Sequence, residues 1–309
     1  MDQVITDQAA LTPVARDPAI DPSNIDALTD TQLDVLERQI ASRYMRKVPW
    51  GAVAWGIGNC LFFFTLLPVT ILGYVPLWLG FVLATVSIAA SYLPSHEAQH
   101  NIIAGKGRPL RWLNELVGHM STLPLAYPYR VLRATHMEHH AHTNEPELDP
   151  DYGVHAPSGW QFLVQQIRGR LTGGDPNTHA YAKTLERIGQ GELFLDAVVF
   201  EVVYHLVLFT LAWSGFALEA ALLWWLPRHL ALIYISYYLS WAPHHPAEET
   251  GRYRDTRGFR SRLGNIVSMG MQYHIIHHLY PRIPLALTPA AYRELKPILA
   301  RRGCDLGGL

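Results

Sequence analysis

The sequence predicts an all-α integral membrane protein with four transmembrane helices in two hairpins and a cytoplasmic helical cap that carries histidine clusters. Three observations support this fold class. Residues 48–95 contain no Asp, Glu, Lys or Arg. A second apolar region covers about 193–241. There are 16 histidines, and none precedes His96. A spanning helix needs about 20 apolar residues, so each apolar region is long enough for two.

The composition of the whole chain agrees with a membrane protein that keeps a water-facing part. Charged residues make up 17% of its 309 residues and hydrophobic residues 49%, while the mean hydropathy is only +0.05. The net charge of -1 shows no basic excess, which argues against nucleic acid as a partner. The two cysteines, Cys60 and Cys304, form no CxxC pattern, so neither a disulfide framework nor a cysteine metal site is expected.

The chain divides into four predicted segments. Residues 1–30 are polar and are expected to be disordered, and they show no cleaved signal peptide. Residues 31–47 have apolar positions at three- and four-residue steps, which indicates an amphipathic helix. Such a helix either lies on the membrane surface or packs on the water-facing part. Residues 48–290 form the predicted membrane domain, and residues 291–309 a C-terminal tail.

Short turns divide each apolar region into a hairpin. Residues 73–76, with the sequence GYVP, fit the first turn, and residues 213–215, with the sequence WSG, fit the second. The second region is interrupted by polar side chains, which are costly inside a membrane and are therefore expected to face the bundle or to lie near its ends. These residues are Asp196, Glu201, His205, Glu219, Arg228 and His229.

The distribution of basic residues predicts the orientation in the membrane. Lys and Arg precede the first apolar region and follow both, whereas the two short turns inside the hairpins contain none. By the positive-inside rule, both termini and the long central segment are expected to be cytoplasmic, and the membrane would be the inner one if the protein is bacterial. All the histidine clusters then lie on this cytoplasmic side.

Three histidine clusters are the main functional signal. In the first, HEAQH, the histidines are four residues apart, and in the other two, HMEHH and HIIHH, they are spaced i, i+3, i+4. On a helix each cluster therefore presents its imidazoles on one face. Such a stripe contributes little to packing and would repel itself if protonated, so a metal site is the better interpretation. The candidate ligands are His96, His100, His136, His139, His140, His274, His277 and His278.

Two other interpretations fit less well. The first cluster matches the HExxH motif of zinc peptidases, in which two histidines bind zinc and the glutamate is a general base. A catalytic zinc needs only three protein ligands, however, and would leave the other clusters unused. A metal transporter or sensor would need ligands along a path through the spans, but the clusters gather on one side. So many histidines indicate two metal ions, and imidazole suits iron, zinc and copper.

The order HxxxH, HxxHH, HxxHH, with the apolar regions around these boxes, resembles the membrane fatty acid desaturase superfamily. This superfamily also includes carotenoid hydroxylases and ketolases and alkane hydroxylases. The flanking sequences at 139–151 (HHAHTNEPELDPD) and 273–284 (YHIIHHLYPRIP) resemble its extended second and third boxes. The resemblance covers roughly residues 50–290. It is specific for the superfamily and much weaker for the substrate.

The resemblance implies that the boxes bind two iron ions and that one more histidine, before the third box, completes the ligand set. The candidates are His244 and His245, which precede Pro246. A residue before proline is disfavoured in the α conformation, so His245 is expected to point off the helix and His244 to be the ligand. His245 is the alternative ligand, or else a residue that supports the ligands. Asp149 and Asp151 either hold ligand histidines through the far ring nitrogen or form a plain acidic turn.

The implied function is an O2-dependent di-iron lipid oxidoreductase. A fatty acid or acyl-lipid desaturase is the first choice, and a carotenoid or other lipid hydroxylase or ketolase is the alternative. No catalytic residue beyond the metal ligands is expected. No iron–sulfur, dinucleotide or haem motif is recognisable, so electrons would come from an external ferredoxin or cytochrome b5-like donor, docked on the arginines of residues 252–262. The remaining histidines are not expected to be ligands: His119, His142, His155, His179, His205 and His229.

Overall fold

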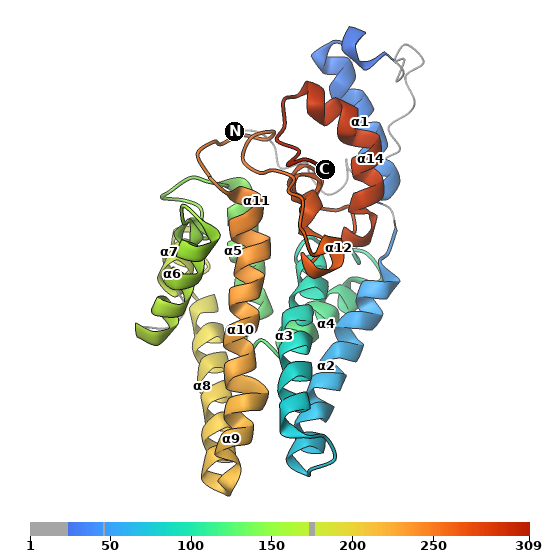
Figure 1. Cartoon of the computed structure of the whole chain (residues 1–309). Helices are drawn as coiled ribbons and strands as arrows, with labels where there is room; N and C mark the ends of the chain where they lie inside the picture. Colours follow the sequence, from blue (N-terminus) through green and yellow to red (C-terminus); the bar gives the residue numbers. More distant parts are fainter. Residues whose placement is uncertain (1–23, 46, 173–176) are drawn as a thin grey trace.

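The computed structural model describes residues 24–45, 47–172 and 177–309, and within these ranges it is all-helical, without a β-strand. Long helices stand side by side, and a cap of shorter helices covers one end of them (Figure 1). Three segments of the described chain are long and apolar enough to cross a membrane. The predicted all-α membrane fold is confirmed at this level.

The first two apolar helices are α2 (Trp50–Ile71) and α3 (Leu77–Gln99). The turn between them falls where the sequence predicts it, and its Gly73 has a φ of 83°. A polar pair joins the two helices: Asn59 Nδ2 donates to the carbonyl oxygen of Ser87 at 2.9 Å, and Ser87 Oγ donates to Asn59 Oδ1 at 2.9 Å. These polar groups inside an apolar hairpin therefore satisfy each other.

The third apolar segment, Leu193–His244, is not one straight helix. At Gly215, inside the predicted turn, φ is 94°, and the chain reverses direction so that α8 and α10 lie side by side (Figure 1). Short π-helical stretches interrupt the returning half. The α-helices of this segment are α8 (Leu193–Leu211), α9 (Ala217–Ala220), α10 (Leu226–Ile235) and α11 (Ala242–His244).

The polar side chains of the third segment differ in their exposure. Arg228 on α10 is buried, as expected; its Nε donates to the carbonyl oxygen of Leu125 at 2.7 Å, and a second guanidinium nitrogen lies 3.4 Å from Glu201. The side chains of Glu201 and His205 on α8 are instead 51% and 43% exposed, although Glu201 contacts the buried Arg228. The reason is that α8 buries only a narrow stripe of its surface.

Four helices of intermediate length lie between the two long pairs in sequence. α4 packs on α2 and α3, and α5 packs on α3 and α8. α6 contacts α10, and α7 contacts α5 and α8. Their bounds are Arg111–Thr122 for α4, Tyr129–Ala141 for α5, Gly159–Thr172 for α6 and Thr178–Arg187 for α7.

The cap is built from both ends of the described chain: α1 (Asp30–Tyr44), α12 (Gly264–Val267), α13 (His274–Leu279) and α14 (Thr288–Arg301). α1 begins at a capping box between Thr29 and Gln32. The apolar face of α1 packs on α13 and α14, which favours the packed alternative for this helix over the membrane surface.

The ends of the chain differ from two expectations. Of the segment predicted to be disordered, residues 1–23 lie outside the described residues, but Ile25–Ala27 forms a 3-10 turn and Leu28 is buried. Residues 291–309, predicted as a tail, contain most of α14, and Leu295 and Ile298 are fully buried in the cap. Their helical spacing is visible in the sequence, but the surface that covers them comes from distant segments.

Candidate metal centre

Four helices, among them α13 of the cap, bring their histidines to one place where the long helices meet the cap. α3 carries His96 near its C-terminal end, and the chain turns away directly after His100, at Asn101, where φ is 56°. α5 and α13 carry the second and third boxes, and α11 ends at His244. The imidazoles form two groups, in each of which one ring nitrogen per residue lies within 4.8 Å of the others. The first group is His96, His100, His136 and His277; the second group is His139, His244, His274 and His278.

His140 lies between these two groups. Its Nε2 is 3.2 Å from Nε2 of His136 and 3.0 Å from Nε2 of His277, both in the first group. Its ring stacks on His278 of the second group, with the centroids 4.2 Å apart. All nine histidines expected as ligands are thus gathered in one centre.

The donor set fits two metal ions. Nε2 atoms approach each other closely, at 2.8 Å between His100 and His136 and 3.2 Å between His244 and His274. Mutual hydrogen bonds cannot satisfy such a cluster, since a neutral imidazole has one N–H and one lone pair. Both ring nitrogens of His96 and Nε2 of His278 are buried without a hydrogen-bond partner. Buried nitrogens that converge on one point are suited to a cation, and an all-imidazole set suits iron, copper or zinc.

The electrostatics of the centre keep most of these imidazoles neutral. Burial, and then the neighbouring imidazoles, hold the pKa of six histidines well below the usual range. Neutral imidazoles have a free lone pair for a metal. The six residues are His100, His136, His140, His274, His277 and His278.

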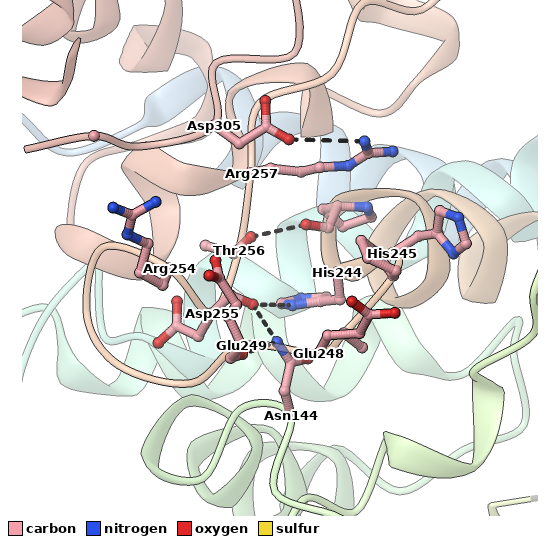
Figure 2. A pocket seen from close by; sticks show the side chains of 14 residues that line it. Asn144, His244, His245, Glu248, Glu249, Arg254, Asp255, Thr256, Arg257 and Asp305 are labelled. Atoms are coloured by element: carbon pink, nitrogen blue, oxygen red, sulfur yellow. Dashed lines mark hydrogen bonds and ion pairs between the residues drawn. The ribbon is translucent and has the colours of Figure 1, made fainter.

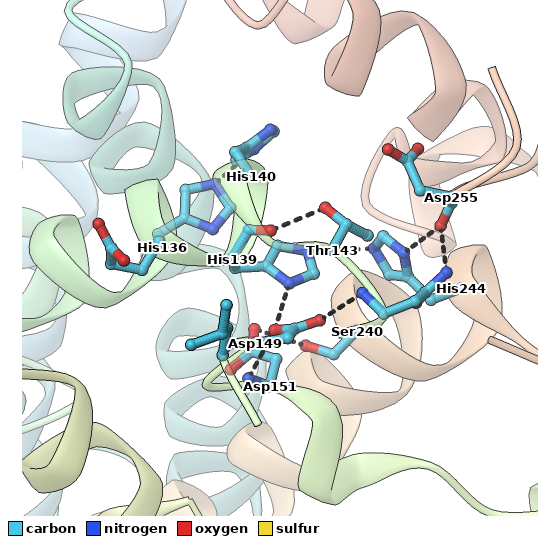
Figure 3. A network of polar contacts seen from close by, with 12 residues as sticks. His136, His139, His140, Thr143, Asp149, Asp151, Ser240, His244 and Asp255 are labelled. Carbon is cyan, nitrogen blue, oxygen red and sulfur yellow. Dashed lines mark hydrogen bonds and ion pairs between the residues drawn. The ribbon is translucent and has the colours of Figure 1, made fainter. Parts of the chain in front are cut away.

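His139 is the exception. Burial acts to lower its pKa, but the charge and the hydrogen bond of Asp149 outweigh burial and raise the pKa of His139 to about 9. Its Nδ1 lies 2.9 Å from Asp149 Oδ1 (Figure 3). A carboxylate that favours positive charge on this imidazole also favours a cation at its other nitrogen, Nε2, which lies 3.3 Å from Nε2 of His244 in the same group.

The structure separates His244 from its neighbour. His244 is buried, and its Nε2 lies 3.3 Å from that of His139. His245 has extended backbone angles (φ -64°, ψ 133°), and its ring stacks on Trp241 outside both groups. In Figure 2 the two rings point in different directions from a polar cavity of about 250 Å³, and His244 reaches the backbone of Asp255. The geometry agrees with the expected effect of Pro246 on the preceding residue.

The two aspartates of the second box differ in their contacts (Figure 3). Asp149 is buried and also accepts backbone N–H groups of Asn144 and Asp151, each at 2.9 Å, so its carboxylate is fixed. The carboxylate of Asp151 contacts the hydroxyl of Tyr181 at 2.9 Å and that of Ser240 at 3.4 Å. Asp149 therefore touches a histidine of the centre directly, whereas Asp151 supports the segment around Asp149.

Sequence reasoning missed several residues that touch the histidines. His244 Nδ1 is 3.1 Å from the carbonyl oxygen of Asp255, and His274 Nδ1 is 3.0 Å from Met271 Sδ. A backbone carbonyl or a thioether has no motif of its own, although Met271 lies only three residues before His274. Glu97 of the HExxH match is buried, and its Oε1 accepts the backbone N–H of Leu285 at 2.8 Å, which ties α3 to the segment before α14.

The histidines that were set aside lie outside both groups. His142 contacts Glu145, at 3.4 Å from Nδ1 to Oε1. His119 packs against the ring of Tyr129, and His155 against that of Tyr152. Each of these three contacts a local partner instead of the ring nitrogens of the two groups.

Known proteins place this geometry in context. The chain is 29% identical over 143 residues to an sn-1 oleoyl-lipid 12-desaturase of Synechocystis sp.. This match covers 43% of this chain and 37% of the desaturase. It is 25% identical to a fatty acid conjugase of Calendula officinalis, over 70% of this chain and 67% of the conjugase. It is 27% identical to a beta-carotene ketolase of Paracoccus sp., over 62% of this chain and 69% of the ketolase. The family model described as fatty acid desaturase matches residues 72–306, and the chain therefore belongs to the fatty acid desaturase family.

Proposed function

We propose that this enzyme is an O2-dependent di-iron oxidoreductase of membrane lipids that inserts a double bond into a fatty acyl chain. The observation that carries the proposal is the gathering of nine imidazoles, in two groups of four with His140 between them, at one end of an apolar helical bundle. Membership of the fatty acid desaturase family supports the same chemistry.

We assign the nine histidines as the ligands of two iron ions, with His244 rather than His245 as the ninth. Iron would supply the redox states that O2-dependent attack on an unactivated C–H bond needs and that zinc lacks. The chain itself holds the ligands: α3, α5, α11 and α13 fix the rings, and Asp149 fixes His139. Burial of the histidines would also exclude water from the ions. No side chain is needed as a general acid or base.

The membrane arrangement that we propose has four spans in two hairpins. α2 and α3 form one hairpin, and the Leu193–His244 segment, folded back at Gly215, forms the other. The basic residues before α2, after α3 and after α11 support an orientation in which both termini and the histidine centre are cytoplasmic. The centre then lies where a lipid chain can reach it from the bilayer and a soluble donor from the cytoplasm.

Electrons would come from an external ferredoxin or cytochrome b5-like donor. Arg254, Arg260 and Arg262 are exposed in the segment that follows α11, and an acidic donor fits such a surface. Reversing these three charges should slow reduction by the donor without removing bound iron. Unchanged reduction by every donor tried would reject this docking surface.

A carotenoid ketolase or hydroxylase is the second candidate. The match to the Paracoccus beta-carotene ketolase covers 69% of that protein, a larger share than the 37% of the Synechocystis desaturase. The chain is also 36% identical over 81 residues to a zeaxanthin 4-ketolase of Chlamydomonas reinhardtii. Loss of two hydrogens from adjacent carbons and insertion of oxygen need the same kind of centre, so the substrate that reaches it decides between them.

Lipid mass analysis in hosts with and without a carotenoid pathway tests the proposal. A desaturase product has lost two hydrogen atoms, a hydroxylated product has gained one oxygen, and a ketone has gained one oxygen and lost two hydrogens. Acyl lipids with two hydrogens fewer in both hosts are expected. Modified carotenoids with unchanged acyl lipids would select the second candidate.

A matched pair of variants tests the metal assignment. His140→Ala should abolish the product and reduce bound iron, because Nε2 of His140 lies among the ring nitrogens of the centre. His142→Ala is the control, since its ring contacts Glu145 instead. Full activity of His140→Ala, or purified protein with one zinc and no iron, would reject the assignment.

A further inference from the structure

The two groups of histidines differ in what holds their outer nitrogens. In the second group every Nδ1 has a polar contact in the chain. His139 has the carboxylate of Asp149 at 2.9 Å, and His244 has the carbonyl oxygen of Asp255 at 3.1 Å. The other two contacts are weaker: His274 to Met271 Sδ at 3.0 Å and His278 to Thr143 Oγ1 at 3.5 Å.

The first group lacks this support at two of its members. Nδ1 of His96 and Nδ1 of His277 are both buried without a hydrogen-bond partner in the described chain. The rings of this group are held chiefly by each other, for example His96 against His277 with centroids 4.4 Å apart. No carboxylate is within hydrogen-bonding distance of these two rings in the described chain.

We propose that the two groups bind metal with unequal affinity, that the second group fills first, and that Asp149 is the positioning residue that sets this order. The proposal rests on the metal assignment made above. A histidine whose far N–H donates to a carboxylate is fixed in tautomer and orientation and is a more basic ligand. Loss of such a partner typically lowers metal affinity by about 10- to 100-fold.

Asp149 is suited to this role because it cannot turn away. Its side chain is 2% exposed, and its two oxygens accept the backbone N–H groups of Asn144 and Asp151 besides the ring of His139. The carboxylate thus has one fixed position, set by the turn that follows α5. Nothing comparable orients His96, whose two ring nitrogens both lack partners in the described chain.

Metal titration of the whole protein tests the order. Metal-free protein in detergent is titrated with Co(II), whose visible absorption reports its coordination, against a competing chelator. The wild type should bind two ions in two resolved steps. Asp149→Asn should weaken the tighter step by about 10- to 100-fold and leave the weaker step within about threefold. Glu147→Gln, in the same turn but 85% exposed, is the matched control and should change neither step.

Ligand variants identify the steps and serve even if Asp149→Asn fails to fold. His136→Ala, in the first group, should retain the tighter step, and His139→Ala, in the second, should lose it. Two equal steps in the wild type, or a tighter step lost in His136→Ala and retained in His139→Ala, would reject the order. An Asp149→Asn variant that leaves the tighter step unchanged would reject the role of Asp149. A wild type that binds no stoichiometric metal would reject the metal centre itself.

Discussion

Replacement of Gly118 by alanine should destabilise the helix that carries the second histidine box. Gly118 lies on α4, and a Cβ added there would sit 2.5 Å from ring atoms of Tyr129, at the start of α5. That ring is held in place, because it is 1% exposed and its hydroxyl donates to the carbonyl oxygen of Ala98, at 3.0 Å, between the two histidines of the first box. The ring and α5 must therefore shift.

The expected magnitude follows from three contributions. Overpacking costs about 1–3 kcal/mol, and loss of the buried hydrogen bond about 0.5–1.5 kcal/mol. Alanine regains about 0.5–1 kcal/mol of helix propensity over glycine. The net cost is roughly 0.5–4 kcal/mol, which for a chain of 309 residues corresponds to a melting temperature lower by about 1–6 °C.

Thermal melting of the detergent-solubilised protein, followed by intrinsic fluorescence, measures this effect. Gly58→Ala on α2 is the matched control, because a Cβ there meets nothing within 4 Å, and it should leave the melting temperature equal or slightly higher. Combining Gly118→Ala with Tyr129→Leu should cost less than the sum of the two single changes, since the shorter side chain removes the clash. The reasoning fails if Gly118→Ala has the same melting temperature as the Gly58→Ala control. It also fails if the destabilisation by Gly118→Ala and that by Tyr129→Leu are additive in the double variant.

Three further variants or reactions test other parts of the structure. Trp224→Phe removes the indole N–H that donates to the carbonyl oxygen of Pro124 at 2.8 Å, and it should lower the melting temperature. Trp213→Phe is the control and should leave the melting temperature unchanged, because Trp213 is 94% exposed. Equal melting temperatures of the two variants would contradict the contact. His244→Ala should lower bound metal far more than His245→Ala, measured by elemental analysis, and the reverse result would exchange their roles. Burial, and then nearby Glu37, raise the pKa of the Cys304 thiol to about 12. Because only the thiolate reacts, iodoacetamide at pH 8 should alkylate Cys304 slowly in the folded protein and rapidly after denaturation, and equal rates by peptide mass spectrometry would show that the thiol is accessible.

Much of the candidate centre could be predicted because helical periodicity is local. The i, i+3, i+4 spacing on α5 and α13 places three rings on one face of each helix, whatever the rest of the chain does. The choice of His244 over His245 likewise depended on one local rule, the backbone restriction before Pro246, and the structure places His244 among the other imidazoles.

The division of the histidines into two groups could not be predicted. His136 and His139 are three residues apart on α5, yet they belong to different groups, because their partners come from α3 on one side and from α11 on the other. The role of α14 was missed for the same reason: the face that buries Leu295 is supplied by α1, far away in sequence. Such pairings depend on long-range packing, which periodicity does not encode.

The contacts of Trp224 and Arg228 give the second hairpin, the folded-back segment Leu193–His244, a role besides the proposed crossing of the membrane. Both side chains donate to carbonyl groups of the connection between α4 and α5, those of Pro124 and Leu125. This connection is not helical and Leu125 is 1% exposed, and a buried backbone carbonyl without a hydrogen bond is costly. The second hairpin thus supplies two hydrogen-bond donors to the turn that leads into α5, the helix that carries the second histidine box. A generic hydrophobic hairpin of equal length could replace its anchoring, but it would leave that turn without its two donors.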